Sequence, residues 1–295
     1  MAAIPTLYCL ASLSQVENTP SSQDGIPQGL EEDLRAYGCK LIQQAGILLD
    51  QKQVAVATAQ ILFHRFWYVS SMKQFSIGDI GMGALYLASK LEECPLRIRD
   101  FINVYDLLLQ RSEHKSSSSF RYAPMSYFGS TFYDLKDAIV VSEMQILKRL
   151  GFNVSVVLPY GTLVNYMQVL GLANNKEAVS QAWGYLNDAL QTPVYSIFQV
   201  PTIVSAAILL TTRHLNISLP STRPNCWWEL FDAEWDDIWI VCGFIMRLYR
   251  ERDPAEMMKV VKMVNKTEVR RWLEKQQLEA RNQDQNGSAT TTTPG

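Results

Sequence analysis

Few side chains in this chain of 295 residues have the types and spacing needed for catalysis or metal binding. The five cysteines are widely separated, without a C-x-x-C pair or a histidine at a ligand spacing, which argues against a zinc site and a disulfide framework. Glu92 and Glu93 form an adjacent acid pair, but neighbouring residues on a helix point about 100° apart and do not converge on one substrate. His64 and Arg65 fit structural polar contacts at a helix end. These residues give no strong case for an enzyme.

Lys90 stands out because it ends an apolar helix that is rich in small residues. Gly81, Gly83, Ala84 and Ala88 would let neighbouring helices approach closely, while Lys90 places a cation where the packed helix reaches the surface. We interpret this combination as a rigid platform that holds a charged contact.

Composition limits the class of protein. With 47% apolar and 19% charged residues, the chain can form about two domains with sizeable cores. A net charge of -2 gives no global attraction to nucleic acid or to an anionic membrane. No apolar run reaches the ~18 residues of a membrane span, and the first residues lack the basic region of a signal peptide.

Hydrophobic spacing predicts five helices in the first half of the chain. Pro95 would stop the third helix, and Gly151 would cap the fifth. Serines 116–119 indicate a loop, and residues 153–159 an extended linker. The five predicted helices cover about residues 29–48, 51–68, 77–93, 97–110 and 127–150.

The second half repeats this plan. Phe75 lies 15 residues before Lys90, as Phe198 lies 15 residues before Arg213, and both pairs bracket a helix with small residues. Coincidence between two helices rich in alanine and leucine is the alternative explanation. The predicted elements of this half cover about residues 160–170, 176–190, 201–214, 227–231 and 236–250.

These patterns predict four regions. Residues 1–27 form an irregular arm, 28–155 a first helical domain and 156–252 a second. Residues 253–295 form a polar extension that is partly helical, with its last dozen residues disordered.

The residues resemble the cyclin family over about residues 28–252. The strings ASKLEE, at the end of the third helix, and SEMQILKRLGF, at the end of the fifth, are typical of cyclins. GCKLIQQAGILL, QVAVATAQILFHRF, ASKLEECPLRIRDFINV, QAWGYLNDAL and LPSTRPNCWWELF are similar to the L-type transcriptional cyclins. The resemblance implies an all-α fold of two tandem five-helix cyclin boxes.

The resemblance also implies a function. The chain would be a non-enzymatic regulatory subunit that binds and allosterically activates a cyclin-dependent Ser/Thr kinase as a heterodimer in the nucleus, in RNA polymerase II transcription or RNA processing. Lys90 and Glu143 match the positions that grip the kinase main chain around its mobile αC helix. Apolar positions presented to the kinase match Leu91, Leu147, Phe152 and Val154, each of which also fits ordinary core. A possible selectivity rim, which also fits a solvated helix start, comprises Arg97, Arg99 and Asp100.

Two departures from the family and one rival remain. Helix one reads Leu34-Arg35-Ala36-Tyr37-Gly38-Cys39, which differs from the M-R-A-I-L-type substrate-docking helix of cell-cycle cyclins. The sequence ends in Gln, Asn and Thr, whereas L-type cyclins often carry an Arg/Ser-rich tail associated with splicing compartments. The rival is a TFIIB-like core that binds promoter DNA. The missing N-terminal zinc ribbon and the acidic balance argue against it.

Overall fold

The computed structural model describes residues 11–113, 121–222, 226–251 and 253–288. Within these ranges the secondary structure is helical, with no strand. This confirms the predicted all-α class. None of the described helices is long and apolar enough to cross a membrane. The serine-rich segment 116–119 lies outside the described residues.

The first box is built around α5, which contacts α3, α4 and α7. Ser76 caps the start of α5 by accepting a hydrogen bond from the backbone nitrogen of Asp79. After α5 ends, Glu93 adopts a left-handed turn ahead of Pro95, as the predicted helix end requires. The helix bounds are α3 (Gln28–Leu48), α4 (Gln53–Trp67), α5 (Ile77–Leu91), α6 (Ile98–Glu113) and α7 (Ser130–Arg149).

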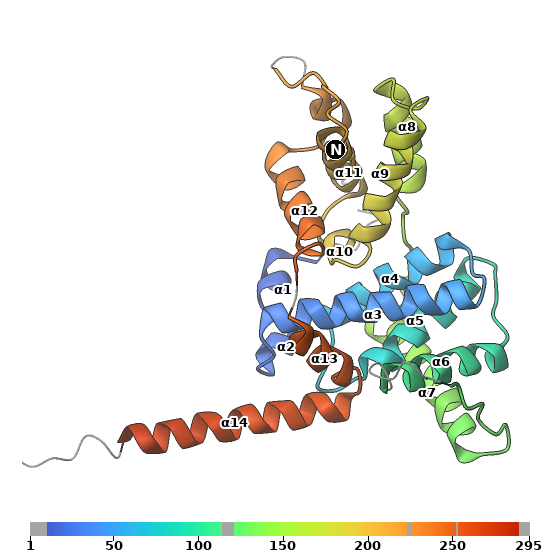
Figure 1. Cartoon of the computed structure of the whole chain (residues 1–295), viewed down its shortest axis with the longest axis vertical. Helices are drawn as coiled ribbons and strands as arrows, with labels where there is room; N and C mark the ends of the chain where they lie inside the picture. Colours follow the sequence, from blue (N-terminus) through green and yellow to red (C-terminus); the bar gives the residue numbers. More distant parts are fainter. Residues whose placement is uncertain (1–10, 114–120, 223–225, 252, 289–295) are drawn as a thin grey trace, which may run out of the picture.

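The second box repeats this arrangement around α11, which contacts α8, α9, η1 and α12 (Figure 1). The predicted Trp-rich element is the 3-10 helix η1, and the short helix α10 (Val194–Ile197) was not predicted. The loop between the boxes, residues 153–159, contains no strand, as expected. The remaining bounds are α8 (Tyr160–Val169), α9 (Lys176–Ala189), α11 (Val200–His214), η1 (Trp227–Phe231) and α12 (Trp235–Arg247).

Helix α4 joins the two boxes. Its buried residues Ala57 and Ile61 belong to the hydrophobic cluster of the second box, while most of the helix packs in the first. Arg65 donates a 2.7 Å hydrogen bond to the carbonyl of Ser155 in the linker. His64 is buried, and its Nε2 lies 3.2 Å from the carbonyl oxygen of Leu190. The structural role predicted for His64 and Arg65 is therefore confirmed.

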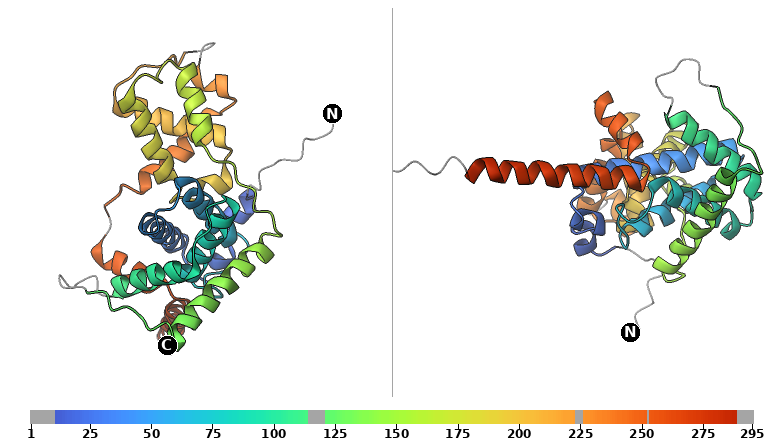
Figure 2. Two further views of the ribbon diagram at one scale, coloured as in Figure 1. Left: turned by 90° about the vertical axis from the view of Figure 1, so that its right-hand side faces the viewer. Right: turned by 90° about the horizontal axis from the view of Figure 1, so that it is seen from below.

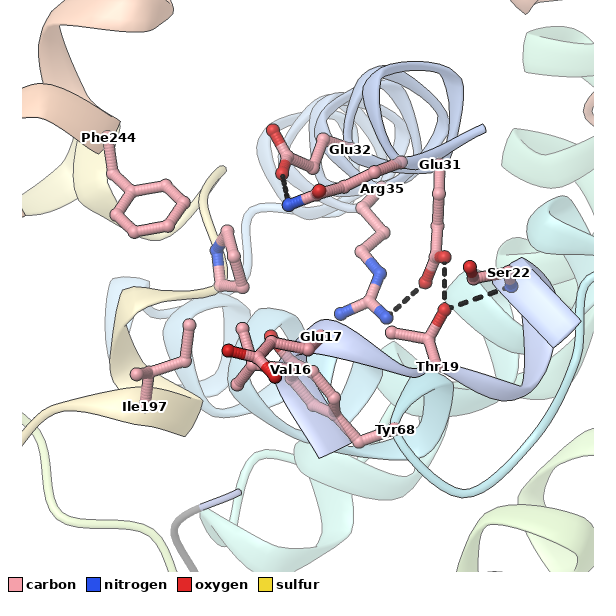
Figure 3. A pocket seen from close by; sticks show the side chains of 12 residues that line it. Val16, Glu17, Thr19, Ser22, Glu31, Glu32, Arg35, Tyr68, Ile197 and Phe244 are labelled. Atoms are coloured by element: carbon pink, nitrogen blue, oxygen red, sulfur yellow. Dashed lines mark hydrogen bonds and ion pairs between the residues drawn. The ribbon is translucent and has the colours of Figure 1, made fainter. Parts of the chain in front are cut away.

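The N-terminal segment is more ordered than predicted. Residues 11–27 contain two short helices, α1 (Leu13–Glu17) and α2 (Pro20–Gln23), each with a side-chain N-cap. Thr19, the cap of α2, also donates a 2.5 Å hydrogen bond to Glu31, which pairs with Arg35 (Figure 3). These buried polar contacts fasten the segment to α3. Helices this short depend on caps and tertiary contacts, which a periodic pattern does not reveal.

The C-terminal segment also differs from a simple polar extension. It forms α13 (Pro254–Lys262) and α14 (Lys266–Ser288), and α13 packs on α3 and α6 (Figures 1 and 2). Val264 caps α5 from outside, because its carbonyl accepts a 3.0 Å hydrogen bond from the backbone nitrogen of Ile77. Several apolar side chains of this segment are buried in the core of the first box: Val260, Val261, Met263, Val264, Val269 and Leu273. The helix continues to Ser288, into the tail expected to be disordered, and residues 289–295 lie outside the described part.

Candidate functional site

The candidate site centres on an ion pair between α5 and α7. The Nζ atom of Lys90 lies 2.5 Å from Oε1 of Glu143 and 4.3 Å from the centre of the Tyr86 ring. The Lys90 side chain is 43% exposed and that of Glu143 14% exposed. The structure thus brings together the two residues that the family resemblance singled out. An ammonium donor and a carboxylate acceptor stand side by side at the surface.

Gly83 sets the distance between the two helices that carry this pair. A methyl group in place of its hydrogen would lie 2.6 Å from Cβ of Ser142, closer than real contacts allow. The predicted close packing is therefore confirmed at Gly83. At Gly81 the nearest atom, on Ile42, would be 3.5 Å away, which is ordinary contact.

The end of α7 turns Phe152 toward solvent. Gly151 and Phe152 both have positive φ, at 58° and 60°, and the Phe152 nitrogen donates a 2.8 Å hydrogen bond to the carbonyl of Leu147. This is the hydrogen bond of a Schellman-type helix end, with Gly151 where the cap was predicted. The Phe152 side chain is 68% exposed. Its backbone is strained, because φ near +60° is unfavourable for a residue other than glycine.

An open groove lies beside this turn, between the end of α5 and the linker that follows α7. Leu91 is exposed on one side of the groove and Phe152 on the other. Val154 also lines the groove, but it is half-buried against the first core, as is Leu147. The predicted apolar set therefore divides into two exposed side chains and two that also support the core.

The predicted rim residues Arg97, Arg99 and Asp100 are all exposed at the start of α6. The Arg99 guanidinium lies 3.7 Å from the centre of the Tyr127 ring. Two hydrogen bonds lower the pKa of the Tyr127 hydroxyl: the one with Asn103 has the larger effect and the one with Arg99 the smaller. Arg99 is therefore held in place by the segment before α7. That the three rim residues select among kinases stays a prediction.

The adjacent acids Glu92 and Glu93 do not act as a pair in the part of the chain that the structure describes. Glu92 accepts a 2.7 Å hydrogen bond from Thr58, while Glu93 lies in the left-handed turn, so the two acids have separate surroundings. Burial raises the pKa of the Cys242 thiol to about 12. No group of three metal-binding side chains occurs among the residues that the structure describes.

Sequence reasoning missed two contributors to this surface. Tyr86 lies one helical turn before Lys90, and its ring supports the ammonium. Met144 follows Glu143 and is exposed on α7, although its position fits the apolar pattern of that helix. The i, i+4 spacing to Lys90 could have revealed Tyr86. No such signal marks Met144, because exposure on a helix with a broad apolar pattern depends on where the neighbouring helices pack.

Comparison with known proteins identifies the family. Residues 8–155 match the family described as "Cyclin, N-terminal domain", and this chain belongs to the cyclin family. Human cyclin-L1 is 40% identical over 289 residues, an alignment that covers 98% of this chain and 53% of the relative. Human cyclin-L2 is 41% identical over 244 residues, covering 83% and 45%. The chain thus spans about half the length of the curated relatives it matches.

Two solved structures share the fold. One is the yeast RNA Pol II CTD kinase CTDK-1 complex, with a TM-score of 0.64, 15% identity, and coverage of 82% of this chain and 73% of that chain. The other is the CAK complex of Chaetomium thermophilum, with a TM-score of 0.60, 17% identity, and coverage of 97% and 94%. At these identities the likeness concerns the fold, and it agrees with two tandem cyclin boxes.

Proposed function

We propose that this chain is a regulatory subunit that binds and allosterically activates a cyclin-dependent Ser/Thr kinase. The observation that carries the proposal is the Lys90 and Glu143 pair, exposed beside Leu91 and Phe152 on a cyclin box. A lysine ammonium donates to carbonyl oxygens, and a carboxylate accepts from amide nitrogens. The pair can therefore hold a partner's main chain without requiring particular side chains.

In the absence of a kinase, the Lys90 side chain is already positioned for binding. Glu143 and the Tyr86 ring hold the Lys90 ammonium at the surface, so little side-chain entropy is lost on docking. Because the Lys90 side chain is open to solvent, its pairing with Glu143 contributes only on the order of 1 kcal/mol to stability, so exchanging it for contacts with a kinase costs little. Exposed apolar area is supplied by Leu91 and Met144, which follow the two charged residues in the sequence, and by Phe152, which shares a groove with Leu91.

Activation follows if the surface binds one kinase conformation better than another. A bound cyclin that favours the inward position of the kinase αC helix lets the Lys and Glu ion pair of the kinase form and position ATP phosphates. The chain would contribute differential affinity and no catalytic group.

We assign this activity to RNA polymerase II transcription or RNA processing, in the nucleus. The support comes from the relatives, which are L-type cyclins, and from the CTDK-1 complex, which is itself named as an RNA polymerase II CTD kinase. Purification of the tagged chain from nuclear extract, followed by identification of the kinase that accompanies it, tests this assignment.

The decisive experiment co-expresses the chain with candidate kinases and measures complex formation and kinase activity. We expect the double variant Lys90→Ala and Glu143→Ala to lose binding by at least about thirtyfold, since even one charge-assisted contact at an interface is worth ~2 to 5 kcal/mol when truncated. The matched control is Lys275→Ala and Glu279→Ala, which removes another Lys and Glu pair, on the distant helix α14. If both double variants bind and activate like the wild type, the proposed interface is wrong.

Exchange of the two charges separates binding from folding. Lys90→Glu combined with Glu143→Lys keeps an ion pair of reversed polarity, so the fold should remain as stable as in the wild type. Kinase binding should not return, because the donor and acceptor positions are exchanged. Full binding by this variant would mean that the pair serves only to join α5 and α7.

A further inference from the structure

Helices α13 and α14 enclose a cleft that the kinase-binding proposal does not use. Met263 is buried in it, whereas Met258 is exposed and Trp272 is half-buried. The Lys259 ammonium lies 4.6 Å from the centre of the Trp272 ring, a cation-π contact that orients both side chains. The cleft therefore has an apolar floor beside a fixed cation. Methionine floors adapt to apolar side chains of different shapes.

The rim of the cleft is mostly cationic. Lys259, Lys262, Arg271 and Lys275 line it, and all four are exposed. Glu268 is the one carboxylate among the lining residues, and it is paired with Arg271 at 2.5 Å. This local excess of positive charge contrasts with the net charge of -2 of the whole chain. An acidic partner would be attracted to this rim in particular.

The same face continues along α14. Arg271, Lys275 and Leu278 follow at i, i+4 and i+7, so they lie on one side of the helix. Leu278 is 59% exposed, and all residues from Glu274 to Glu279 are exposed. Figures 1 and 2 show that this part of α14 projects away from the body of the protein. The helix therefore carries an apolar and cationic face that extends the cleft.

We propose that this cleft and the adjoining face of α14 bind an acidic amphipathic helix of a partner protein. Arg271, which lines the cleft, and Leu278 are seven residues apart on one face of α14, so the cleft and the exposed apolar contact at Leu278 are ~10.5 Å apart at ~1.5 Å rise per residue. That separation fits side chains about two turns apart on a helix lying along α14, the usual mode of helix-in-groove recognition. The partner's carboxylates would face Lys259, Lys262, Arg271 and Lys275.

The chemistry favours a peptide over nucleic acid. Lys259 already lies against the Trp272 ring, so this ring is not a free platform for a base. The floor supplied by Met258 and Met263 suits an aliphatic side chain. A second copy of the chain is a poorer partner, because α14 itself carries four cations and three acids between Lys266 and Glu279 and so offers no acidic face.

The test uses the full chain and a fluorescein-labelled helical peptide that carries leucine on one face and glutamate on the other. Fluorescence anisotropy should show saturable binding that weakens as salt is raised, because exposed charges are screened. A peptide with serine in place of leucine, a peptide with lysine in place of glutamate, and single-stranded oligoadenylate should each bind at least about tenfold more weakly, a difference of ~1.4 kcal/mol.

Two variants test the location of the site. Lys262→Glu with Arg271→Glu reverses the rim, and Met258→Ser with Leu278→Ser removes two exposed apolar contacts. Each should weaken peptide binding about tenfold or more. Lys176→Glu with Arg213→Glu, which makes the same charge change at exposed positions of the second box, should bind like the wild type.

The proposal is overturned if the acidic peptide binds no better than its serine control, if oligoadenylate binds better, or if rim reversal has no effect. Dimerisation through α14, seen by sedimentation and abolished by Leu278→Ser, would also overturn it.

Discussion

Gly83 on α5 lies so close to Glu143 on α7 that any side chain at position 83 would displace Glu143. A methyl group at Gly83 would lie 3.0 Å from the backbone nitrogen of Glu143 and 2.6 Å from Cβ of Ser142. No flexible side-chain end is available to move aside, because the contacted atoms belong to the backbone and Cβ of α7. The absence of a side chain at Gly83 therefore lets α7 bring Glu143 beside Lys90.

Gly83→Ala should destabilise the first box and weaken kinase binding together. Overpacking in a tight core costs ~1 to 3 kcal/mol, which exceeds the gain of up to ~1 kcal/mol that alanine brings to a helix. Denaturant unfolding measures the first effect, and pull-down of the kinase measures the second. Gly184→Ala in α9 is the control, since a methyl group there meets nothing within 4 Å. It should leave the free energy of unfolding unchanged or raise it. Equal stability of the two variants would contradict the close-packing argument.

Phe152→Gly should separate stability from binding, because it should lower kinase affinity without lowering the stability of the fold. Glycine adopts φ near +60° without the strain of ~1 to 2 kcal/mol that Phe152 bears, although it also increases the entropy of the unfolded chain by a similar amount. The unfolding midpoint should therefore rise slightly or stay unchanged, while loss of this exposed aromatic lowers kinase affinity. Asn216→Gly is the matched control, because Asn216 has φ of 53° in the turn after α11. Its kinase binding should equal that of the wild type.

The sequence is sufficient to locate the helices that carry the site. The predicted ranges of α5 and α7 begin and end within about three residues of the observed ones, because Pro95 and Gly151 are strong local stop signals. The proximity of Lys90 to Glu143 came from the family resemblance. Their 2.5 Å contact joins two residues that are 53 positions apart in the sequence and depends on the packing of α5 against α7, which no local pattern encodes.

Contacts between distant segments account for what the sequence did not reveal. The Ser76 hydroxyl donates to the carbonyl of Val264, 188 residues away, so the C-terminal segment helps to cap α5. Apolar residues are frequent around Val264, but their spacing does not say which domain they join. The N-terminal helices of five and four residues are likewise too short for a periodic signal.

Acidification should weaken the contact between the boxes through His64. Burial, followed by the nearby positive charge of Arg35, lowers the pKa of His64 to about 3, although its hydrogen bond with the Leu190 carbonyl acts in the opposite direction. An unfolded histidine titrates near 6.5, so between these values the unfolded state binds more protons. The free energy of unfolding should therefore fall as pH decreases below ~6.5, by up to ~1.4 kcal/mol per pH unit.

Unfolding by denaturant between pH 7 and pH 5 measures this slope above the range in which most carboxylates titrate. His64→Gln should reduce the slope, even if the variant is less stable throughout. His214→Gln, at an exposed position, should retain it. A slope that is the same in all three proteins would assign the pH dependence to other groups.

Truncation after residue 252, the predicted end of the second box, should unfold the first box. It removes six side chains buried in the first core and the carbonyl of Val264 that accepts from Ile77. At ~1.5 to 3 kcal/mol for each apolar side chain, the loss is on the order of 10 kcal/mol, comparable with the ~5 to 15 kcal/mol that stabilises a typical protein.

The control is truncation after Lys275, which keeps all six residues. This protein should unfold at the temperature of the full chain. Thermal unfolding followed by circular dichroism compares the three lengths. Because α5 carries Lys90, the shorter protein should also fail to bind a kinase. If it instead unfolds cooperatively at the original temperature, α13 and the start of α14 are accessory to the first box.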